Sequence, residues 1–307
     1  MTELHGTVEA AVAALRNGRL IGMPTETVYG LGADARNAAA VARIFSVKGR
    51  PPNHPLIVHI ASADQLDSWA GNISDDAHTL AHSLWPGPLT LILERHPDVP
   101  GAISGGRPTI GLRIPNHLVA LEILTQFGGG VAAPSANRFG KVSPTTAQHV
   151  ASEFSVPEEI AVLVDGGPCH IGVESTIVDA STPTISILRH GNISGHTISE
   201  LISRDVIDGT HGEARASGML AAHYQPDAVV HLTFTFDERD QIVDALHPAS
   251  VYVIPAFESV EQYARGLYHH LRQADALRVA HIVVVAPPPA DGLANAIRDR
   301  LYKAAHR

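Results

Sequence analysis

Short runs of hydrophobic residues alternate along the chain with segments in which hydrophobic residues recur every three or four positions. Residues 20–23 and 56–60 are nearly continuous hydrophobic runs, which are typical of buried strands. Between them, the pattern over 37–46 indicates a helix that leads to Lys48 and Arg50 on the loop beyond it. Further strands are predicted at 89–93, 109–114, 131–133, 161–164, 176–179 and 185–189, and further helices at 7–15, 62–69 and 75–84. This alternation predicts an α/β fold.

The regular pattern lapses over 208–217 and resumes in a second unit. From residue 228 strand and helix alternate three times, with strands at 229–234, 250–254 and 281–286 and helices at 238–246, 259–271 and 292–305. This order predicts a small, parallel, three-stranded, Rossmann-like α/β domain. We therefore expect a first domain at 1–205, a linker at 206–227 and a C-terminal domain at 228–307. Residues 218–226 are too hydrophobic for a solvated connector, and we expect them to form a lid over the first domain, the alternative being that they dock the second domain.

Composition narrows the class of protein. The chain has 307 residues, of which 45% are hydrophobic, and we expect a soluble, cytoplasmic protein because neither a membrane span nor a signal peptide is indicated. Cys169 is the only cysteine, which excludes an intramolecular disulfide and a multi-cysteine zinc site. A net charge of −9 argues against a broad nucleic-acid-binding surface but leaves room for a local basic pocket.

Polar and cationic side chains follow several of the predicted strands. Thr25, Glu26 and Thr27 come directly after 20–23, and hydroxyl, amide and cationic groups follow 131–133. Because ligands bind at strand ends in open α/β sheets, this recurrence predicts a site more strongly than any single loop. Arg113 lies inside a hydrophobic run and requires either a buried partner or a ligand anion, of which we favour the ligand.

The motifs of several common enzymes are missing. Gly140 and Lys141 are followed by Val142 rather than by Ser or Thr, so there is no Walker A loop, and there is no nucleophile elbow. What remains is a set of cations and hydroxyls that suits phosphoryl or nucleotidyl transfer, in which positioning and charge neutralisation supply most of the rate. The set is Lys48, Arg50, Arg113, Lys141 and Arg189, with Thr27, Ser135, Ser143 and Ser175.

Six motifs occur in an order that resembles a known family. They are PTETVYGL at 24–31, KGRP at 48–51, PLIVH at 55–59, WPGPLT at 85–90, PSAN at 134–137 and ESTIVD at 174–179. Together they resemble the YrdC-type threonylcarbamoyl-AMP synthase family, and the tail from Gly218 resembles its long, two-domain form. The resemblance implies an open, twisted YrdC-like sheet with a concave basic site. It also implies synthesis of L-threonylcarbamoyl-AMP and pyrophosphate from L-threonine, bicarbonate or CO2, and ATP, assisted by Mg²⁺.

The resemblance also implies roles for individual residues. It assigns threonine contacts to Thr27, His59, Arg113, the backbone of Ala133, and Ser175. It assigns ATP contacts to Arg50, His54, Thr109, Ser135, Ser143, Arg189 and Tyr224, and it makes Lys48 and Arg50 the catalytic cations at the phosphates. No protein ligand to a metal is assigned. The product would pass to the machinery that transfers threonylcarbamoyl to tRNA, with weak or absent direct tRNA binding by this chain.

Two alternatives belong to other classes. A similar domain forms carbamoyl-AMP in carbamoyltransferases, but those proteins carry further catalytic domains. A non-catalytic RNA-binding module would also use a basic concavity, and the net charge of −9 weighs against it. Pyrophosphate release with threonine or with carbamoyl phosphate would separate these possibilities.

Overall fold

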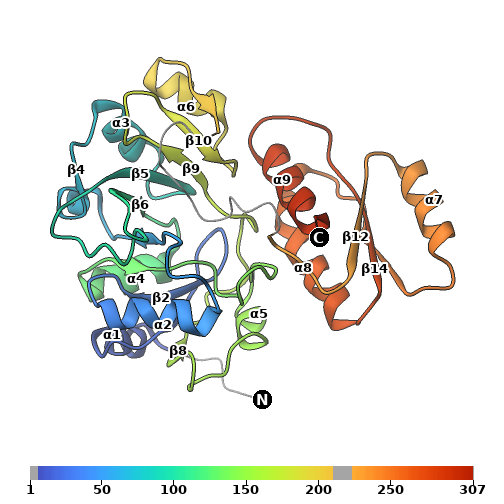
Figure 1. Ribbon diagram of the computed structural model, residues 1–307, viewed down its shortest axis with the longest axis horizontal. Helices are drawn as coiled ribbons and strands as arrows, with labels where there is room; N and C mark the ends of the chain where they lie inside the picture. Colours follow the sequence, from blue (N-terminus) through green and yellow to red (C-terminus); the bar gives the residue numbers. More distant parts are fainter. Residues whose placement is uncertain (1–5, 210–222, 307) are drawn as a thin grey trace.

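A computed structural model describes residues 6–209 and 223–306. Figure 1 shows a larger unit, formed by the first part of the chain, beside a smaller unit that carries α7, α8 and α9. Of the predicted linker at 206–227, residues 210–222 lie outside the described residues, so the lid stays a prediction. The division at 205 and 227 stays a prediction. No helix in the described ranges is both long and hydrophobic enough to cross a bilayer.

The larger unit is built on a mixed sheet. Its strands are β1 (Ile21–Met23), β2 (Gly30–Asp34), β3 (Ile57–His59), β4 (Ala70–Gly71), β5 (Leu89–Arg95), β6 (Thr109–Arg113), β7 (Val131–Ala132), β8 (Val162–Leu163), β9 (Thr176–Asp179), β10 (Ser186–Arg189) and β11 (Ile207–Asp208). The spatial order is β11-β10-β9-β5-β6-β3-β7-β2-β1-β8, and β4 pairs with β5. The α/β fold with a large sheet is therefore confirmed.

Most of the helices around this sheet begin after a residue whose side chain caps the first turn. The helices are α1 (Val8–Arg16), α2 (Ala38–Lys48), α3 (Asp75–Leu84), α4 (Leu118–Phe127), α5 (Ala147–Ala151) and α6 (Gly195–Ile202). Asn37 caps α2 by accepting the N–H of Ala40, and Gly49 ends the helix in the left-handed region with φ 65°. Lys48 is thus the last residue of the helix and not, as we expected, on the loop beyond it.

Some elements differ from the sequence-based prediction. The segment Ala63–Ser68 is a 3₁₀ helix (η1) rather than an α-helix. Strand β2 was not predicted, because Gly-Leu-Gly-Ala-Asp shows no alternation of hydrophobic and polar positions. Helix α4 was also not predicted, and its N-cap residue His117 makes no side-chain capping bond.

The smaller unit has the predicted parallel sheet. Strands β12 (Val229–Thr233), β13 (Val251–Val253) and β14 (His281–Val285) are parallel in the order β12-β14-β13, with helices α7 (Phe236–Leu246), α8 (Val260–Ala276) and α9 (Leu293–Ala305). Helix α8 buries a stripe that includes Tyr263, Leu267, Tyr268 and Leu271. The three-stranded α/β prediction is confirmed.

The two units share one hydrophobic cluster. Val28, Val142 and Val173 of the larger unit belong to the same buried cluster as Leu267 and Tyr268 of α8. At Gly172, with φ +86°, a Cβ atom would lie 2.5 Å from the carbonyl oxygen of Ala264. Only glycine allows this approach, so the backbones of the two units meet directly.

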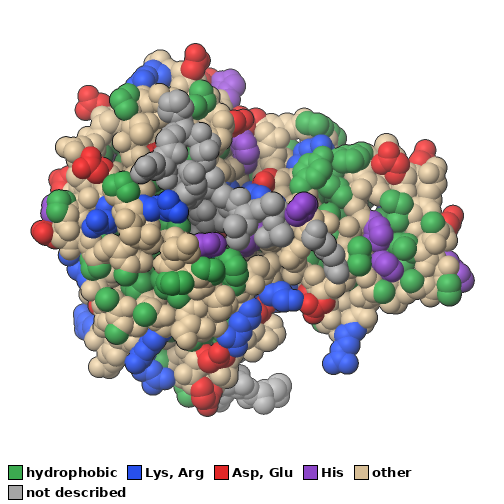
Figure 2. All heavy atoms as spheres, in the orientation of Figure 1, with side chains coloured by type: hydrophobic (Ala, Val, Ile, Leu, Met, Phe, Trp, Pro, Cys, Tyr) green, Lys and Arg blue, Asp and Glu red, His purple; other side chains and the backbone are tan. Residues whose placement is uncertain are grey.

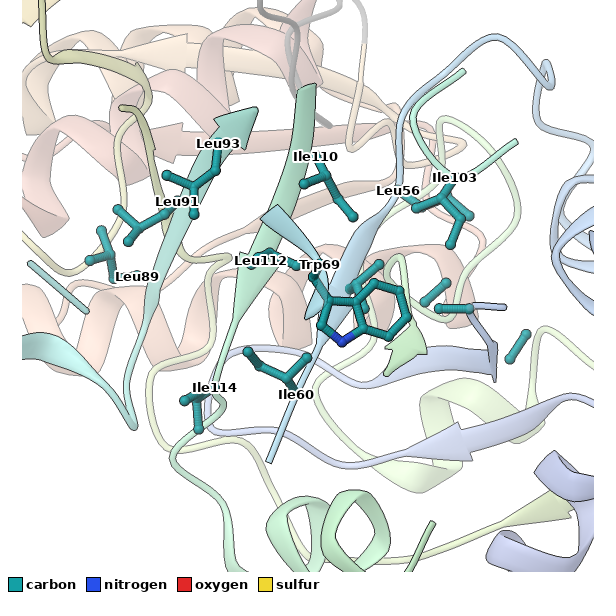
Figure 3. Close-up of a cluster of buried hydrophobic side chains, with 14 of the residues drawn as sticks. Leu56, Ile60, Trp69, Leu89, Leu91, Leu93, Ile103, Ile110, Leu112 and Ile114 are labelled. Atoms are coloured by element: carbon teal, nitrogen blue, oxygen red, sulfur yellow. The ribbon is translucent and has the colours of Figure 1, made fainter. Parts of the chain in front are cut away.

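On the face shown in Figure 2, Lys and Arg side chains lie among Asp and Glu side chains rather than in one basic patch. Beneath the surface, the core of the larger unit lies on its central strands. Figure 3 shows Leu89, Leu91 and Leu93 of β5 beside Ile110 and Leu112 of β6. This packing fixes the strands whose ends carry the candidate site.

Candidate active site

A cavity opens where several strands of the larger unit end. It is lined by Thr25, Thr27, Val28, Gly30, Arg50, Ile57, His59, Arg113, Ala133, Pro134, Ser135, Glu174, Ser175, Arg189, His223 and Tyr224. Residues of the ends of β3, β6 and β10 and of the loops after β1 and β7 are therefore gathered at one place. Nine of the residues that the resemblance assigned to substrates line it, and four do not.

All five residues assigned to threonine lie on the cavity wall. They are Thr27, His59, Arg113, Ala133 and Ser175. The first of these is oriented by a turn after β1, in which Thr25 Oγ1 accepts the backbone N–H groups of Thr27 and Val28 at 3.2 Å each. Thr25 donates its own proton to the Val28 carbonyl at 2.6 Å, and its Oγ1 lies 2.9 Å from Thr27 Oγ1. Thr27 Oγ1 also accepts a hydrogen bond from Arg113.

Arg113 has a protein partner. Its Nη2 lies 2.8 Å from Oε1 of Glu26, and both side chains are 5% exposed. This contact is an ion pair without hydrogen-bond geometry, whereas Arg113 Nη1 donates to Thr27 at 2.9 Å and Nε donates to the Gly87 carbonyl at 3.2 Å. Of the two possibilities for Arg113, the structure shows the buried partner, Glu26, and the ligand contact that we favoured stays a prediction. Glu26 is visible in the sequence only as a polar residue between Thr25 and Thr27, and its role as the neighbour that a buried arginine requires appears only in the fold.

His59 is buried beside this ion pair. Burial, together with the charge of Arg113, lowers its pKa to about 3, so the imidazole is neutral at physiological pH. Its Nδ1 has no hydrogen-bond partner within the part of the chain that the structure describes. A neutral ring with an unused nitrogen can bind a polar group of a ligand.

Two further arginines line the cavity. Arg189 donates from Nε to the Ser175 carbonyl and from Nη2 to Ser175 Oγ, both at 3.0 Å. Arg50 donates to the Pro55 carbonyl at 2.9 Å, and burial lowers its pKa to about 10, which leaves it charged at neutral pH. Three buried guanidinium groups, with Arg113, therefore surround one cavity that contains few carboxylates.

Tyr224, near the start of the second described range, forms part of the cavity wall. Its φ of +60° is unusual for a residue with a large side chain. The ring centroid lies 4.1 Å from that of His223 and 5.7 Å from that of Tyr268, with the two tyrosines stacked at 27°. The hydroxyl is buried, and no described residue bonds to it. Such a donor is available to a ligand.

The remaining assigned residues do not line the cavity. Lys48 Nζ donates to the carbonyl oxygens of Ser135, at 2.6 Å, and Asn137. Burial lowers the pKa of Lys48 well below its usual value. His54 packs against the edge of Phe139, with ring centroids 5.5 Å apart, and Thr109 begins β6 opposite Glu94. Ser143 is buried and donates to Glu174 at 2.6 Å.

Glu174 is a cavity residue that the sequence did not point to. Besides Ser143, it accepts hydrogen bonds from Tyr268 at 2.9 Å and from Arg300 Nε at 3.2 Å. Burial raises its pKa, but Arg300, Arg189 and Ser143 outweigh this and lower it to about 2. The only signal in the sequence was its place at the start of the 174–179 motif, because its partner Arg300 is 126 residues away.

No group of three or more His, Cys, Asp or Glu side chains placed to hold a metal occurs in the described ranges. Among the described residues that line the cavity, Glu174 is the only one with a carboxylate, and its oxygens already accept three hydrogen bonds. The wall therefore offers phosphate-binding cations rather than a magnesium cage, which would need several oxygen ligands.

Known proteins of the same kind match nearly the whole chain. A family model described as "Telomere recombination" (Sua5_yciO_yrdC) matches 13–191, and one described as "Threonylcarbamoyl-AMP synthase, C-terminal domain" matches 193–306. The threonylcarbamoyl-AMP synthase of Pyrococcus abyssi is 38% identical, over 97% of this chain and 93% of its own length. That of Bacillus subtilis is also 38% identical, over 97% of this chain and 92% of its own.

Solved structures agree with these matches. The crystal structure of P. abyssi Sua5 complexed with L-threonine is 38% identical and superimposes with a TM-score of 0.90, over 97% of this chain and 94% of that chain. Full-length HypF in a phosphate- and nucleotide-bound form shares the fold alone, at 14% identity and a TM-score of 0.52 over 60% of this chain and 28% of that one. By the family models and by relatives that align over almost their full length, this chain belongs to the two-domain threonylcarbamoyl-AMP synthase family.

Proposed function

We propose that this chain is a nucleotidyltransferase that makes L-threonylcarbamoyl-AMP and pyrophosphate from L-threonine, bicarbonate or CO2, and ATP, for the threonylcarbamoyladenosine modification of tRNA. The observation that carries the proposal is the convergence of Arg50, Arg113 and Arg189 on one buried cavity, in a chain of this family. Two anionic substrates need such a set of cations, because each must lose water when it enters a buried site.

Threonine would occupy the side of the cavity near Arg113. Its carboxylate would share the guanidinium with Glu26, and the Thr27 hydroxyl and neutral His59 would contact its polar groups. The N–H of Ala133 already donates to the Ile57 carbonyl at 3.0 Å, so the carbonyl of Ala133 is the backbone group we expect threonine to meet. Ser175, which is bonded to both Thr90 and Arg189, would lie between the two substrates.

ATP would occupy the side near Arg50, Arg189, Ser135 and Tyr224, and we propose that His54, Thr109 and Ser143 support it from beyond the wall. Arg50 and Lys48 are the proposed catalytic cations. To reach a phosphate, the ammonium of Lys48 has to exchange the carbonyls of Ser135 and Asn137 for phosphate oxygens. Magnesium, when bound to ATP, would neutralise phosphate charge, and the nucleotide rather than the protein would supply most of its ligands.

The reaction needs no protein nucleophile. The threonine amine attacks CO2 and loses a proton, which forms a carbamate. A carbamate oxygen then attacks the α-phosphorus, and the bond from that phosphorus to the β-phosphate bridging oxygen breaks to release pyrophosphate. The arginines hold the two anions together and stabilise charge on the leaving group, which is the main contribution expected of an enzyme in phosphoryl chemistry.

Pyrophosphate release tests the proposal directly. We expect release from the full-length protein only when threonine, bicarbonate and ATP are all present, because the attacking carbamate needs the first two. Carbamoyl phosphate should not replace threonine and bicarbonate. Full-rate release without threonine would contradict the proposal, and release that depends on carbamoyl phosphate would favour a carbamoyltransferase instead. The acidic product would then pass to the machinery that transfers threonylcarbamoyl to tRNA.

A further inference from the structure

The carboxylate of Glu174 is held on the cavity wall from the other unit of the molecule. Glu174 is 6% exposed, and two of the three groups that donate hydrogen bonds to its carboxylate belong to helices α8 and α9 of the smaller unit. Tyr268 on α8 donates its hydroxyl at 2.9 Å, and Arg300 on α9 donates from Nε at 3.2 Å. The third donor, Ser143, comes from the larger unit.

The same two residues also contact Tyr224. The ring of Tyr268 stacks on that of Tyr224, with centroids 5.7 Å apart, and the guanidinium carbon of Arg300 lies 5.5 Å from the centroid of the Tyr224 ring. Arg300 further donates from Nη1 to the His190 carbonyl at 2.8 Å, directly after Arg189 in the chain, and its Nη1 pairs with Asp299 at 3.1 Å. Arg300 and Tyr268 thus reach three parts of the wall at once.

Holding the two units together does not by itself explain the contacts of Arg300 and Tyr268. The Arg300 side chain is 0% exposed, and a buried ion pair joins two surfaces no better than hydrophobic side chains of similar size would. Hydrophobic contact is already present in the cluster around Val173 and Leu267. What the polar contacts add is orientation, because hydrogen bonds fix the direction of Glu174 and stacking fixes the plane of Tyr224.

We propose that Arg300 and Tyr268 are positioning residues through which the C-terminal domain builds the nucleotide side of the cavity. The inference rests on the proposed function for the identity of the nucleotide. It bears mainly on one side, because Ser143, Arg189 and Tyr224 near Glu174 are all proposed to serve ATP, whereas Ser175, the next residue in the chain, is the single proposed threonine contact beside it. The hydrogen bonds of Thr27 and Arg113 run instead to Thr25 and Gly87 within the larger unit.

A Tyr268→Phe variant tests the inference with the smallest change. It removes the hydroxyl that Glu174 accepts and keeps the ring that stacks on Tyr224. Tyr263→Phe is the matched control, because Tyr263 lies on the same helix, is also buried, and donates to the Val285 carbonyl at 2.7 Å within the C-terminal domain. We expect Tyr268→Phe to raise the KM for ATP about three- to tenfold, the effect of one hydrogen bond of ordinary strength, and to leave the KM for threonine unchanged.

A second pair of variants removes the cation. Arg300→Met should raise the KM for ATP about tenfold or more, because it leaves Glu174 without its cation. Arg298→Met is its control on the same helix, where the guanidinium donates to the Pro287 carbonyl at 2.7 Å and lies 5.5 Å from the Phe234 ring. Thermal unfolding of each variant shows whether a loss of activity reflects unfolding, and Tyr268→Phe decides the question if Arg300→Met does not fold.

The outcomes separate the inference from the proposed function. The inference is overturned if Tyr268→Phe raises the KM for ATP no more than Tyr263→Phe does, or if it lowers kcat while both KM values stay constant. Equilibrium binding of ATP to the full-length protein, without threonine, provides a readout that needs no turnover. If the wild-type protein binds ATP but makes no pyrophosphate, and Tyr268→Phe weakens that binding relative to Tyr263→Phe, the proposed function fails while the inference stands.

Discussion

Glu26, Thr27 and the Gly87 carbonyl surround the guanidinium of Arg113, which lies on an otherwise hydrophobic strand. The fork of a guanidinium can serve these partners and a substrate carboxylate together, whereas an ammonium group cannot. We expect Arg113→Lys to weaken threonine binding by about 1.5 to 3 kcal/mol, measured by calorimetry. Arg95→Lys is the control, because Arg95 donates to the Arg107 carbonyl and does not line the cavity. An unchanged threonine affinity would remove Arg113 from the substrate site.

Lys48 allows a different test of a single residue. Its ammonium is bonded to carbonyls of the 135–137 loop and has to move to meet the phosphates. Lys48 is proposed to neutralise negative charge that develops on the phosphates during the reaction. Lys48→Ala should therefore lower kcat at least tenfold and change the KM for threonine little. Lys141→Ala, at an exposed ion pair with Asp227, should change neither. If Lys48→Ala lowers kcat and raises the KM for threonine by similar factors, Lys48 has a purely structural role.

At the scale of elements, the turn after β1 shows how local sequence builds part of the site. Thr25 holds this turn with one donated and two accepted hydrogen bonds, and so orients Thr27. Thr25→Val keeps the shape of the side chain but leaves buried N–H groups unpaired. We expect it to reduce the free energy of unfolding by about 1 to 3 kcal/mol and to weaken threonine binding. Thr25→Ser, which retains the hydroxyl, should preserve both the free energy of unfolding and the affinity for threonine. Urea unfolding measures the first and calorimetry the second, and an equal loss in Thr25→Ser and Thr25→Val would contradict the role of the hydroxyl.

Elements with clear caps and periodicity could be predicted from the sequence. Helices α1 and α2 begin after Thr7 and Asn37, whose side chains accept backbone N–H groups, and the parallel order of β12, β13 and β14 follows from alternation with helices. Strand β2 could not be predicted, because its glycines and alanine form a strand only through pairing with β1 and β7.

The same limit applies to the site. The hydroxyls and arginines were predictable because each belongs to a local element. Thr27 and Ser135 follow β1 and β7, Arg113 and Arg189 end β6 and β10, and Arg50 follows α2. Glu26 and Glu174 were missed as site residues because their importance comes from Arg113 and Arg300, which are distant in the sequence. Pairing across the fold is a tertiary property, and neither periodicity nor spacing encodes it in one sequence.

At the scale of the whole molecule, Gly172 marks the point where the two units meet. Alanine there would bring both the strain of φ +86° and a clash with the Ala264 carbonyl, 2.5 Å from the new Cβ. At Gly167, with φ +82°, a Cβ would meet nothing within 4 Å. Gly167→Ala should therefore cost about 1 kcal/mol of unfolding free energy, and Gly172→Ala about 1 to 3 kcal/mol more. Equal costs in urea unfolding would mean that the units do not pack as closely as described.

The burial of the Arg300–Glu174 pair has a consequence for the response of the enzyme to ionic strength. The two side chains are 0% and 8% exposed, so dissolved ions have almost no access to them, whereas Lys141 and Asp227 are 46% and 78% exposed and are readily screened. Added salt would weaken the exposed Lys141–Asp227 contact between the units and leave the buried Arg300–Glu174 contact intact. Inhibition by salt would then report competition between small anions and the polyphosphate chain for the arginines, rather than separation of the two halves.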